Sequence, residues 1–418
     1  MKIGYACVNV VLPDTASRTC RRRNATQALL TELIGSNLDA LERIIDYNIE
    51  KRIPLFRISS DLIPFGSDEV NPIDWVTVFS ERFERIGGKI RQSGMRVSMH
   101  PGQYTVLNSP DGSIVHNAVE DLKYHAKVLD ALGMDDSNKI ILHIGGVYGD
   151  KPTAVGRFLH SWQKLPVHLQ RRIVIENDDK LFHIDDVLSI GLAAGIPVVY
   201  DNLHNLANPA DPSVTDRDWI ERCAATWKPE DGRPKIHYSQ QDPGRRIGAH
   251  SGTIGIDAFM DFVGTLEGCA PDIMLEVKDK NLSAIKCLRC TSPDTRTRDL
   301  ENEWSLYKYK ILEQSPAAYL AIRELLKDKK GCPSRAFYRQ VETALAGATT
   351  PTNVLTAAQH VWGYFKDKAT PMERKRFFDA LGGYMDGTKR AETFRRILYR
   401  LAEKYEEAYL LKSYYFFL

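Results

Sequence analysis

Short runs of apolar and β-branched residues recur eight times along roughly the first 280 residues, and each run ends in polar residues. Most runs are followed by a stretch with helical periodicity, which is typical of βα units. In one such stretch, residues 37–52, the apolar positions of one helix face are Leu38, Leu41, Ile44, Ile45 and Ile49. The eight predicted strands cover residues 3–10, 55–61, 96–101, 139–145, 172–177, 196–204, 235–240 and 272–278.

Eight consecutive units of this kind predict an α/β fold, a single (β/α)₈ TIM barrel over residues 1–298. A doubly wound sheet is the competing architecture, but it usually has fewer strands and a glycine-rich phosphate turn, which does not follow the first run here. In a barrel, functional groups gather at the C-terminal ends of the strands, and the polar residues lie there in this sequence. The pattern therefore favours the barrel.

After residue 298 the pattern changes to long helical stretches without any strand-like run. This change predicts a second, all-helical module of unknown function over residues 299–418, beginning with a helix at 300–314 and closing with one at 393–415. Proline and glycine positions divide the module into about four helices. We expect its aromatic end, from Tyr409 to Phe417, to dock on the barrel or on a partner.

The charge balance and the cysteines of the chain exclude few classes of protein. The chain has 56 basic and 54 acidic residues in 418, so any nucleic-acid surface must be local. Its N-terminus resembles neither a signal peptide nor a membrane anchor, so we expect a cytoplasmic protein without membrane contact. The seven cysteines are expected to be free thiols, because Cys287 and Cys290 have the spacing of a zinc half-site but lack a second pair.

Histidines and carboxylates stand at the ends of the predicted strands, with one more histidine in the glycine-rich loop after the seventh strand. Imidazole and carboxylate together suit zinc, manganese or iron. These donors are too many for one ion, and neighbouring divalent ions indicate phosphate-ester hydrolysis, with Glu176 as the natural bridging ligand. The other histidines fall between strands and are expected to point away. The candidate ligands are His100, His143, Glu176, Asp201, His204, His237, His250 and Glu276.

Lys235 is the unusual member of this set. Residues two apart on a strand share a face, so Lys235 is expected one layer below His237 in the barrel. Burial and positive neighbours disfavour an ammonium there. Three alternatives remain open: a neutral amine, an amine carboxylated by carbon dioxide, or an ordinary buried pair with an acid.

Several motifs together resemble the ultraviolet damage endonuclease family over residues 1 to about 290. The resemblance implies a barrel hydrolase with a cluster of two to three divalent ions, Mn²⁺ favoured and Zn²⁺ possible. Such enzymes nick duplex DNA immediately 5′ to pyrimidine dimers or 6-4 photoproducts and so begin excision repair. We expect a monomer in the bacterial cytoplasm that associates with the nucleoid when it acts. The motifs are 4–9 (GYACVN), 57–61 (RISSD), 98–104 (SMHPGQY), 143–146 (HIGG), 176–179 (ENDD), 201–204 (DNLH), 235–239 (KIHYS) and 276–280 (EVKDK).

The resemblance also implies roles for individual residues. Glu176, His237, Glu276 and Lys235 are the expected catalytic group, with Lys235 as N6-carboxylysine. Carried over position by position, the first metal site is His100, His143 and Glu176, the second is Glu176, Asp201, His237 and Glu276, and the third is His204 and His250.

The same resemblance implies contacts with the damaged duplex. Gln103 and Tyr104 match a pair that wedges into the duplex opposite the lesion, and Tyr5 and Asn9 match residues that line the lesion pocket. From the residues alone, Gln103 and Tyr104 could also be ordinary turn residues after Pro101.

Basic side chains near the predicted mouth are the candidates for contacts with the DNA backbone, and a solvated loop is their alternative. Arg57 is expected to hold phosphate or to pair with a ligand carboxylate, and the same holds for Lys278. The loop candidates are Arg18, Arg21, Arg22, Arg23, Arg245 and Arg246.

Other functions stay open at this point. A sugar isomerase or epimerase of the xylose-isomerase type would need fewer histidines and no wedge pair. An abasic-site endonuclease of the endonuclease IV type shares the architecture and differs in its preferred substrate. A non-catalytic DNA- or protein-binding module would not need a full set of metal ligands.

Overall fold

The computed structural model describes residues 1–329 and 331–418. Within these residues the chain forms two compact units. The first unit comprises Met1–Ile254 and Asp261–Ile285, and the second comprises Gly255–Met260 and Lys286–Leu418. The sequence-based boundary after residue 298 stays a prediction.

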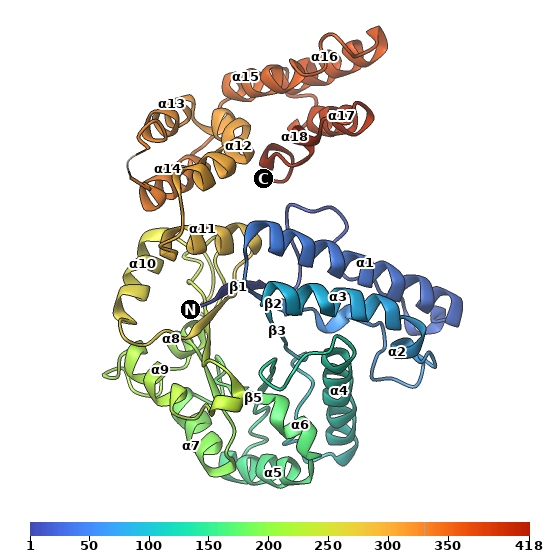
Figure 1. The fold of residues 1–418 in the computed structure, drawn as a ribbon, viewed down its shortest axis with the longest axis vertical. Helices are drawn as coiled ribbons and strands as arrows, with labels where there is room; N and C mark the ends of the chain where they lie inside the picture. The colour runs from blue at the N-terminus through green and yellow to red at the C-terminus, as the bar shows by residue number, and fades with distance from the viewer. Residues whose placement is uncertain (330) are drawn as a thin grey trace. The chain divides into compact units, whose positions relative to one another are not determined.

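Eight parallel strands close into a barrel in the first unit, in the order β1 to β8, with β1 paired to both β2 and β8. Figure 1 shows the helices of this unit surrounding the strands. The predicted TIM barrel is therefore confirmed, and the doubly wound sheet is excluded because the sheet has no open edge. The strands are β1 (Ile3–Ala6), β2 (Leu55–Ile58), β3 (Arg96–Met99), β4 (Ile140–His143), β5 (Ile173–Glu176), β6 (Val198–Asp201), β7 (Lys235–Tyr238) and β8 (Asp272–Leu275).

Every strand is shorter than the sequence pattern predicts. β1 ends at Ala6 because Cys7 takes a left-handed conformation with φ of 71°. The predicted strand 196–204 was wrong at its end, since β6 stops at Asp201 and helix α8 (Asn202–Ala207) follows directly. The side chain of Asp201 caps α8 by accepting a hydrogen bond from the backbone N–H of His204. His204 thus lies on a helix rather than on a strand.

The outer layer of the first unit consists of helices between the strands. The first of them, α1 (Gln27–Lys51), starts ten residues before the predicted helix, where Thr26 caps it by accepting from the Leu29 backbone. Ile49 was predicted to face the core but is 38% exposed. The other helices of this unit are α2 (Trp75–Val78), α3 (Ser80–Ser93), α4 (Gly112–Ala131), α5 (Lys151–Lys164), α6 (Val167–Arg172), α7 (Ile184–Ala194) and α9 (Asp216–Ala224). Two more helices, α10 (Ile256–Thr265) and α11 (Asn281–Thr291), are divided between the two units.

The second unit is helical, as the sequence predicts, but it has more helices than the four expected. The predicted last helix 393–415 was wrong, because the chain turns after Lys404. The aromatic end does not need the barrel as a docking surface: the Tyr414 ring packs edge-on against Tyr307, and Tyr415 belongs to the apolar core of this unit. The helices are α12 (Thr297–Gln314), α13 (Pro316–Leu325), α14 (Ser334–Ala346), α15 (Pro351–Trp362), α16 (Pro371–Met385), α17 (Ala391–Lys404) and α18 (Ala408–Leu411).

Among the described residues, no helix combines the length and the apolar character that crossing a membrane would require.

Candidate metal centre

The register of neighbouring strands brings four of the predicted ligands together in pairs. β4 and β5 are aligned so that His143 lies opposite Glu176, and β6 and β7 are aligned so that Asp201 lies opposite His237. Neighbouring strands are about 5 Å apart, so each pair is within reach of one ion. Both pairs lie at the C-terminal ends of their strands, where barrel active sites are built.

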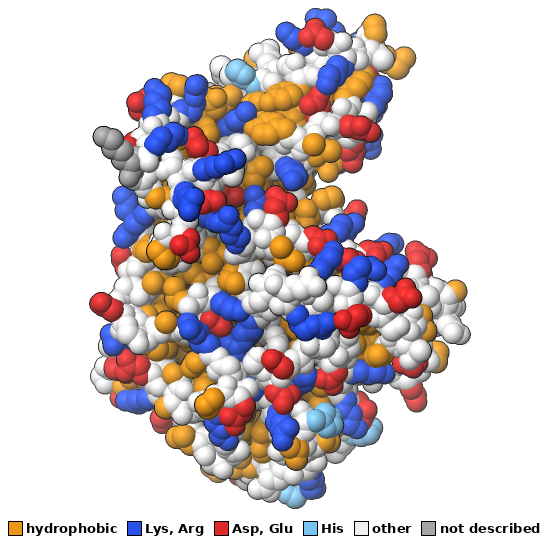
Figure 2. Space-filling model, viewed as in Figure 1, with side chains coloured by type: hydrophobic (Ala, Val, Ile, Leu, Met, Phe, Trp, Pro, Cys, Tyr) orange, Lys and Arg blue, Asp and Glu red, His pale blue; other side chains and the backbone are white. Residues whose placement is uncertain are grey.

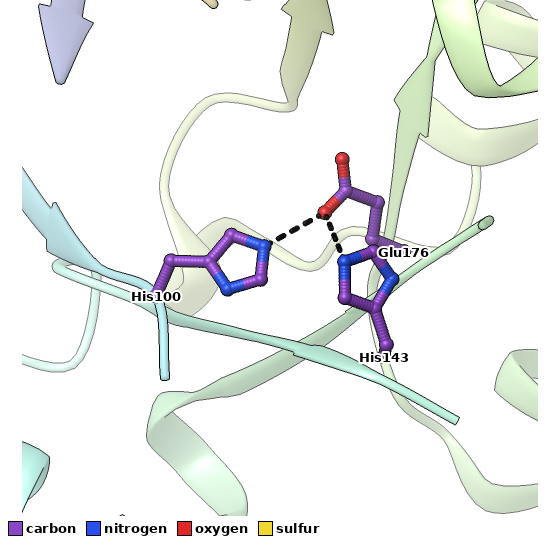
Figure 3. Close-up of side chains that lie close together, drawn as sticks. All are labelled: His100, His143 and Glu176. Carbon is purple, nitrogen blue, oxygen red and sulfur yellow. Dashed lines mark hydrogen bonds and ion pairs between the residues drawn. The ribbon is translucent and has the colours of Figure 1, made fainter. Parts of the chain in front are cut away.

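The carboxylate of Glu176 is the centre of the first group. Its side chain is almost fully buried, and Oε2 lies 3.1 Å from Nε2 of His100 and 3.6 Å from Nε2 of His143. Figure 3 shows the two imidazoles approaching the same carboxylate oxygen. The other oxygen, Oε1, lies 2.5 Å from Nδ1 of His237. One carboxylate thus joins imidazoles from β4, from β7 and from the residue directly after β3, which is the position of a bridging ligand.

Two overlapping sets of side chains could each hold an ion: His100, His143 and Glu176, and Glu176, Asp201 and His237. In each set the possible donor atoms lie within 4.8 Å of one another. In the same residues, three polar atoms are buried without a hydrogen-bond partner in the described part of the chain: Nδ1 of His143, Oδ2 of Asp201 and Nε2 of His237. Such atoms are costly unless something binds them. The donor set therefore fits divalent ions that accept nitrogen and oxygen ligands.

The pKa values indicate strong electrostatic interactions between the buried carboxylates and imidazoles of the site. Burial alone would raise the pKa of Glu176, but the charges of His237, His100 and His143 hold it well below its usual range. Burial lowers the pKa of His143 to about 4. For His204, burial is outweighed by the carboxylates of Asp201 and Glu176, which raise its pKa to about 9. The carboxylates here therefore attract positive charge, which divalent ions would supply while releasing protons.

Glu276, just after β8, extends the cluster. Its Oε1 lies 3.2 Å from Nδ1 of His237, and its Oε2 lies 3.9 Å from Nε2 of His250. Arg57 donates to Oε1 of Glu276, and this pairing contributes to holding the pKa of Glu276 well below its usual range although burial opposes it. Arg57 thus pairs with the Glu276 carboxylate, and its expected contact with phosphate stays a prediction.

His204 lies at the edge of the same cluster. Its Nδ1 is 3.9 Å from Oε1 of Glu176 and 3.9 Å from Oδ1 of Asp201, and it is 2.8 Å from the backbone oxygen of Asn177. All eight predicted ligands thus gather at one barrel mouth. Their division into three separate metal sites stays a prediction.

Lys235 occupies the layer below, as strand parity predicts. It is fully buried, and its Nζ makes no hydrogen bond with any described residue. Burial, together with the positive charges of Arg96, Arg57 and Lys139, lowers its pKa well below the usual range, although Asp272 opposes this. Asp272 is instead 3.0 Å from Arg96. The ordinary buried ion pair is therefore not formed, and a neutral or carboxylated amine remains.

Some residues that support the site were not found from the sequence. Asn177 holds Asp201 through two hydrogen bonds between its side chain and the Asp201 backbone. Ser60 donates to the backbone oxygen of His100 and is 3.0 Å from Nε2 of His125. His125 had been expected to be irrelevant to the site. The local sequence pattern around His125 could not reveal this role, because His125 is linked to His100 only through Ser60, and the three residues lie far apart in the chain.

The residues expected at the lesion fall into two environments. Gln103 and Tyr104 are exposed, the tyrosine by 82%. They line a groove of about 700 Å³ that includes His143. Tyr5, in contrast, is fully buried, and its hydroxyl is bonded to Asn48 and to Asn9. Contact of Tyr5 and Asn9 with a lesion stays a prediction, since neither side chain reaches solvent here.

Basic residues border the cluster on another side, in a pocket of about 680 Å³. Lys280 also lines this pocket, although the sequence did not single it out beyond its place in the motif 276–280. It is partly buried and has a left-handed backbone conformation. Arg21, Arg22 and Arg23 are exposed near a short 3₁₀ turn. No cysteine belongs to a candidate metal group among the described residues. The residues that line the basic pocket beside the cluster are Arg57, Arg245, Arg246, Ala249, His250, Glu276, Val277, Lys278 and Lys280.

Comparison with known proteins agrees with this geometry. Residues 1–298 match the model of the family described as UV-endonuclease UvdE, and residues 308–418 match a family described as a protein of unknown function, DUF1722. A UV DNA damage endonuclease of Clostridium perfringens (strain 13 / Type A) is 41% identical over 332 residues, covering 78% of this chain and 80% of the relative. One of Bacillus cereus (strain Q1) is 35% identical over 296 residues, covering 68% of this chain and 93% of the relative.

Among solved structures, the crystal structure of SacUVDE superimposes with a TM-score of 0.66 and 38% sequence identity, over 69% of this chain and 97% of that chain. The family model covers the whole barrel with its ligand cluster, and the relatives cover most of the chain. The chain therefore belongs to the UV-endonuclease UvdE family.

Proposed function

We propose that this protein is a DNA repair endonuclease that hydrolyses the phosphodiester bond immediately 5′ of ultraviolet photoproducts in duplex DNA. The observation that carries the proposal is the buried Glu176 carboxylate joined to three imidazoles, beside donor atoms without partners. That cluster lies in a barrel whose relatives are named UV DNA damage endonucleases. Cyclobutane dimers and 6-4 photoproducts are the proposed lesions.

The cofactor is proposed to be a cluster of two to three divalent ions, with Mn²⁺ favoured. His100, His143 and Glu176 would hold one ion, and Glu176, Asp201, His237 and Glu276 a second, with His204 and His250 at a third. Bound there, the ions would supply hydroxide near neutral pH and neutralise the charge on the phosphate and the departing oxygen.

The protein's own contribution is to fix these ligands before the substrate arrives. Arg57 fixes Glu276, and the Asn177 side chain fixes the backbone at Asp201. The histidines His204 and His250 are oriented by backbone oxygens at Nδ1. Outer contacts of this kind select the ring orientation and increase the basicity of a ligand.

Lys235 is proposed to carry the carboxylate of N6-carboxylysine. The neutral amine would form an N–C bond with carbon dioxide and lose a proton, and the product would be an anion. Its negative charge would lie near Arg96, Arg57 and Lys139, whose positive charges now act on Lys235 from around it. The modification would thus replace an unpartnered buried amine with a group that those cations stabilise.

Recognition of the lesion is proposed to use the exposed Gln103 and Tyr104. The phenol ring can replace the stacking that two extruded bases lose, while the amide fills the space left in the duplex. Photoproducts stack and pair poorly, so their extrusion costs less than that of sound bases. Arg245, Arg246 and Lys278 would hold phosphates beside the cluster.

The test is incision of DNA by the purified full chain. Irradiated supercoiled plasmid should be nicked with Mn²⁺ and remain intact in chelator, and an end-labelled duplex with one thymine dimer should be cut immediately 5′ of it. Matched duplexes with an abasic site or without damage separate this activity from that of an abasic-site endonuclease. His237→Gln should lose incision, whereas His116→Gln, an exposed histidine on α4, should not. Faster cutting of the abasic duplex than of the dimer duplex would refute the proposed specificity.

A further inference from the structure

The helical module contains a groove between α16 and α17 that the proposed incision does not use. It has a volume of about 850 Å³. Figure 2 shows several blue side chains over the part of the module labelled α16 and α17 in Figure 1. We call it the basic groove, because cationic residues dominate its lining: Lys375, Arg376, Lys389, Arg390, Arg396 and Arg400.

Two acids also line the basic groove, but they leave most of its positive charge unbalanced. Asp379 is engaged by Lys375 at 2.7 Å, and Glu392 is the other acid. The exposed arginines Arg376, Arg396 and Arg400 make no ion pair with any described residue. Residues 371–404 contain nine basic and five acidic residues, whereas the whole chain is nearly balanced. The excess of positive charge is therefore local.

The connection between the two helices is folded back tightly, so the basic groove is part of the fold. Thr388 and Lys389 both donate to the backbone oxygen of Gly383, and Nζ of Lys389 lies 3.3 Å from the Asp379 backbone oxygen. A Cβ at Gly383 would lie 2.8 Å from Cδ of Lys389, so a larger residue there would displace the Lys389 side chain. The cationic rows on the two helices are thus held at a fixed separation.

The spacing of the arginines suits an extended polyanion. Arg396 and Arg400 lie one turn apart on the same side of α17, and Arg390, the residue just before the helix, lines the same groove; ten helical residues would span about 15 Å. Each strand of a DNA duplex carries about four phosphates over this length of helix axis. Guanidinium groups bind phosphate through a planar fork of donors. A single small anion would not need a row of this length.

We propose that the basic groove binds the sugar-phosphate backbone of DNA without regard to sequence. This contact would be additional to the one at the barrel mouth, and two linked contacts raise the overall affinity for one DNA molecule. The choice of DNA over another linear polyanion rests on the proposed function of the barrel. The binding itself follows from the charge and shape of the groove.

The experiment measures binding of the full chain to an undamaged, fluorescein-labelled duplex of 20 base pairs by fluorescence anisotropy, in chelator and from 50 to 200 mM salt. The test variant is Arg396→Gln/Arg400→Gln. The control variant is Lys366→Gln/Arg374→Gln, which removes two exposed charges of the same module outside the groove. The test variant should bind about tenfold more weakly at 100 mM salt, and the slope of log K against log salt should fall by about two.

A third variant, Arg390→Gln, should lower the slope by about one. Melting temperatures equal to that of the wild type would exclude unfolding as the cause. An unchanged slope and affinity in the test variant would overturn the proposal, as would an equal loss in the control. The proposal would also be overturned if the test variant lost binding to an RNA duplex or an acidic peptide but bound DNA as well as the wild type does. No incision is measured, so a failure of the proposed nuclease activity would not affect this result.

Discussion

Replacement of Glu176 by glutamine tests whether one carboxylate serves both groups of candidate metal ligands. Glutamine keeps the size of the side chain and one acceptor oxygen but removes the negative charge. In the structure this charge faces His100 and His143 at Oε2 and His237 at Oε1. The change therefore removes the negative charge that both candidate sites share while disturbing the packing of β5 very little.

The expected magnitude follows from ligand-linked stability. An ion present at 100 times its Kd stabilises the folded protein by about 2.7 kcal/mol. For a unit of this size that is roughly 5 °C in melting temperature. Loss even of an outer contact to a metal ligand lowers affinity 10- to 100-fold, so we expect at least about 100-fold for the shared ligand itself. At the same Mn²⁺ concentration the variant would then gain less than about 0.5 kcal/mol, or about 1 °C.

The assay is calorimetric melting with and without Mn²⁺ after treatment with chelator, combined with titration calorimetry to count the ions bound. Glu32→Gln is the matched control, because Glu32 is exposed on α1 and lies outside the cluster. The control should keep the full metal-induced shift. If Glu176→Gln also kept the full shift, Glu176 would not be a shared ligand. If the wild type showed no shift with any divalent ion, the metal centre itself would be refuted.

Three further predictions concern other parts of the barrel. Protein incubated with ¹³C-bicarbonate should show a carbamate signal by NMR that Lys235→Met lacks and Lys123→Met retains; a signal that persists in Lys235→Met would assign the modification elsewhere. Tyr104→Ala should lower the preference for irradiated over undamaged duplex about tenfold, since the side chain is exposed and its loss removes stacking worth about 1–3 kcal/mol; an unchanged ratio of incision rates would exclude the wedge role. Hydrogen bonding by Arg85 lowers the pKa of Glu42 to about 2, so this carboxylate stabilises the fold above pH 4.5 and loses that effect as the pH falls toward 2. Glu42→Gln should therefore lower the free energy of unfolding by about 1 kcal/mol at pH 7 and by progressively less toward pH 3 in urea titrations, and a difference independent of pH would contradict the pairing.

Much of the candidate site could be predicted because barrel architecture turns sequence order into position. Polar residues at the ends of eight short apolar runs predicted a shared mouth, and His143 and Glu176 do lie side by side there. Lys235 could be placed below His237 from the two-residue period of a strand alone. These inferences needed only local patterns and the known closure of the fold.

The contacts between distant segments could not be predicted in this way. Ser60 links His125 to His100, and Arg57 pairs with Glu276, because closure of the barrel brings these residues together. The ends of the strands could not be predicted either. The strand predicted to reach His204 ends at Asp201, because the Asp201 side chain caps a helix that starts there.

By itself, the sequence determined the number of βα units, the helical character of the last third and the types of side chain available for chemistry. Local periodicity is sufficient for these properties, because burial of one face is imposed residue by residue along each element. Only the tertiary structure decided which donors share the Glu176 carboxylate, that the amine of Lys235 has no partner among the described residues, and that arginines of α17 line a groove with α16. Those outcomes depend on register, closure and competition for hydrogen bonds between segments far apart in the chain, and these are settled only when the whole unit packs.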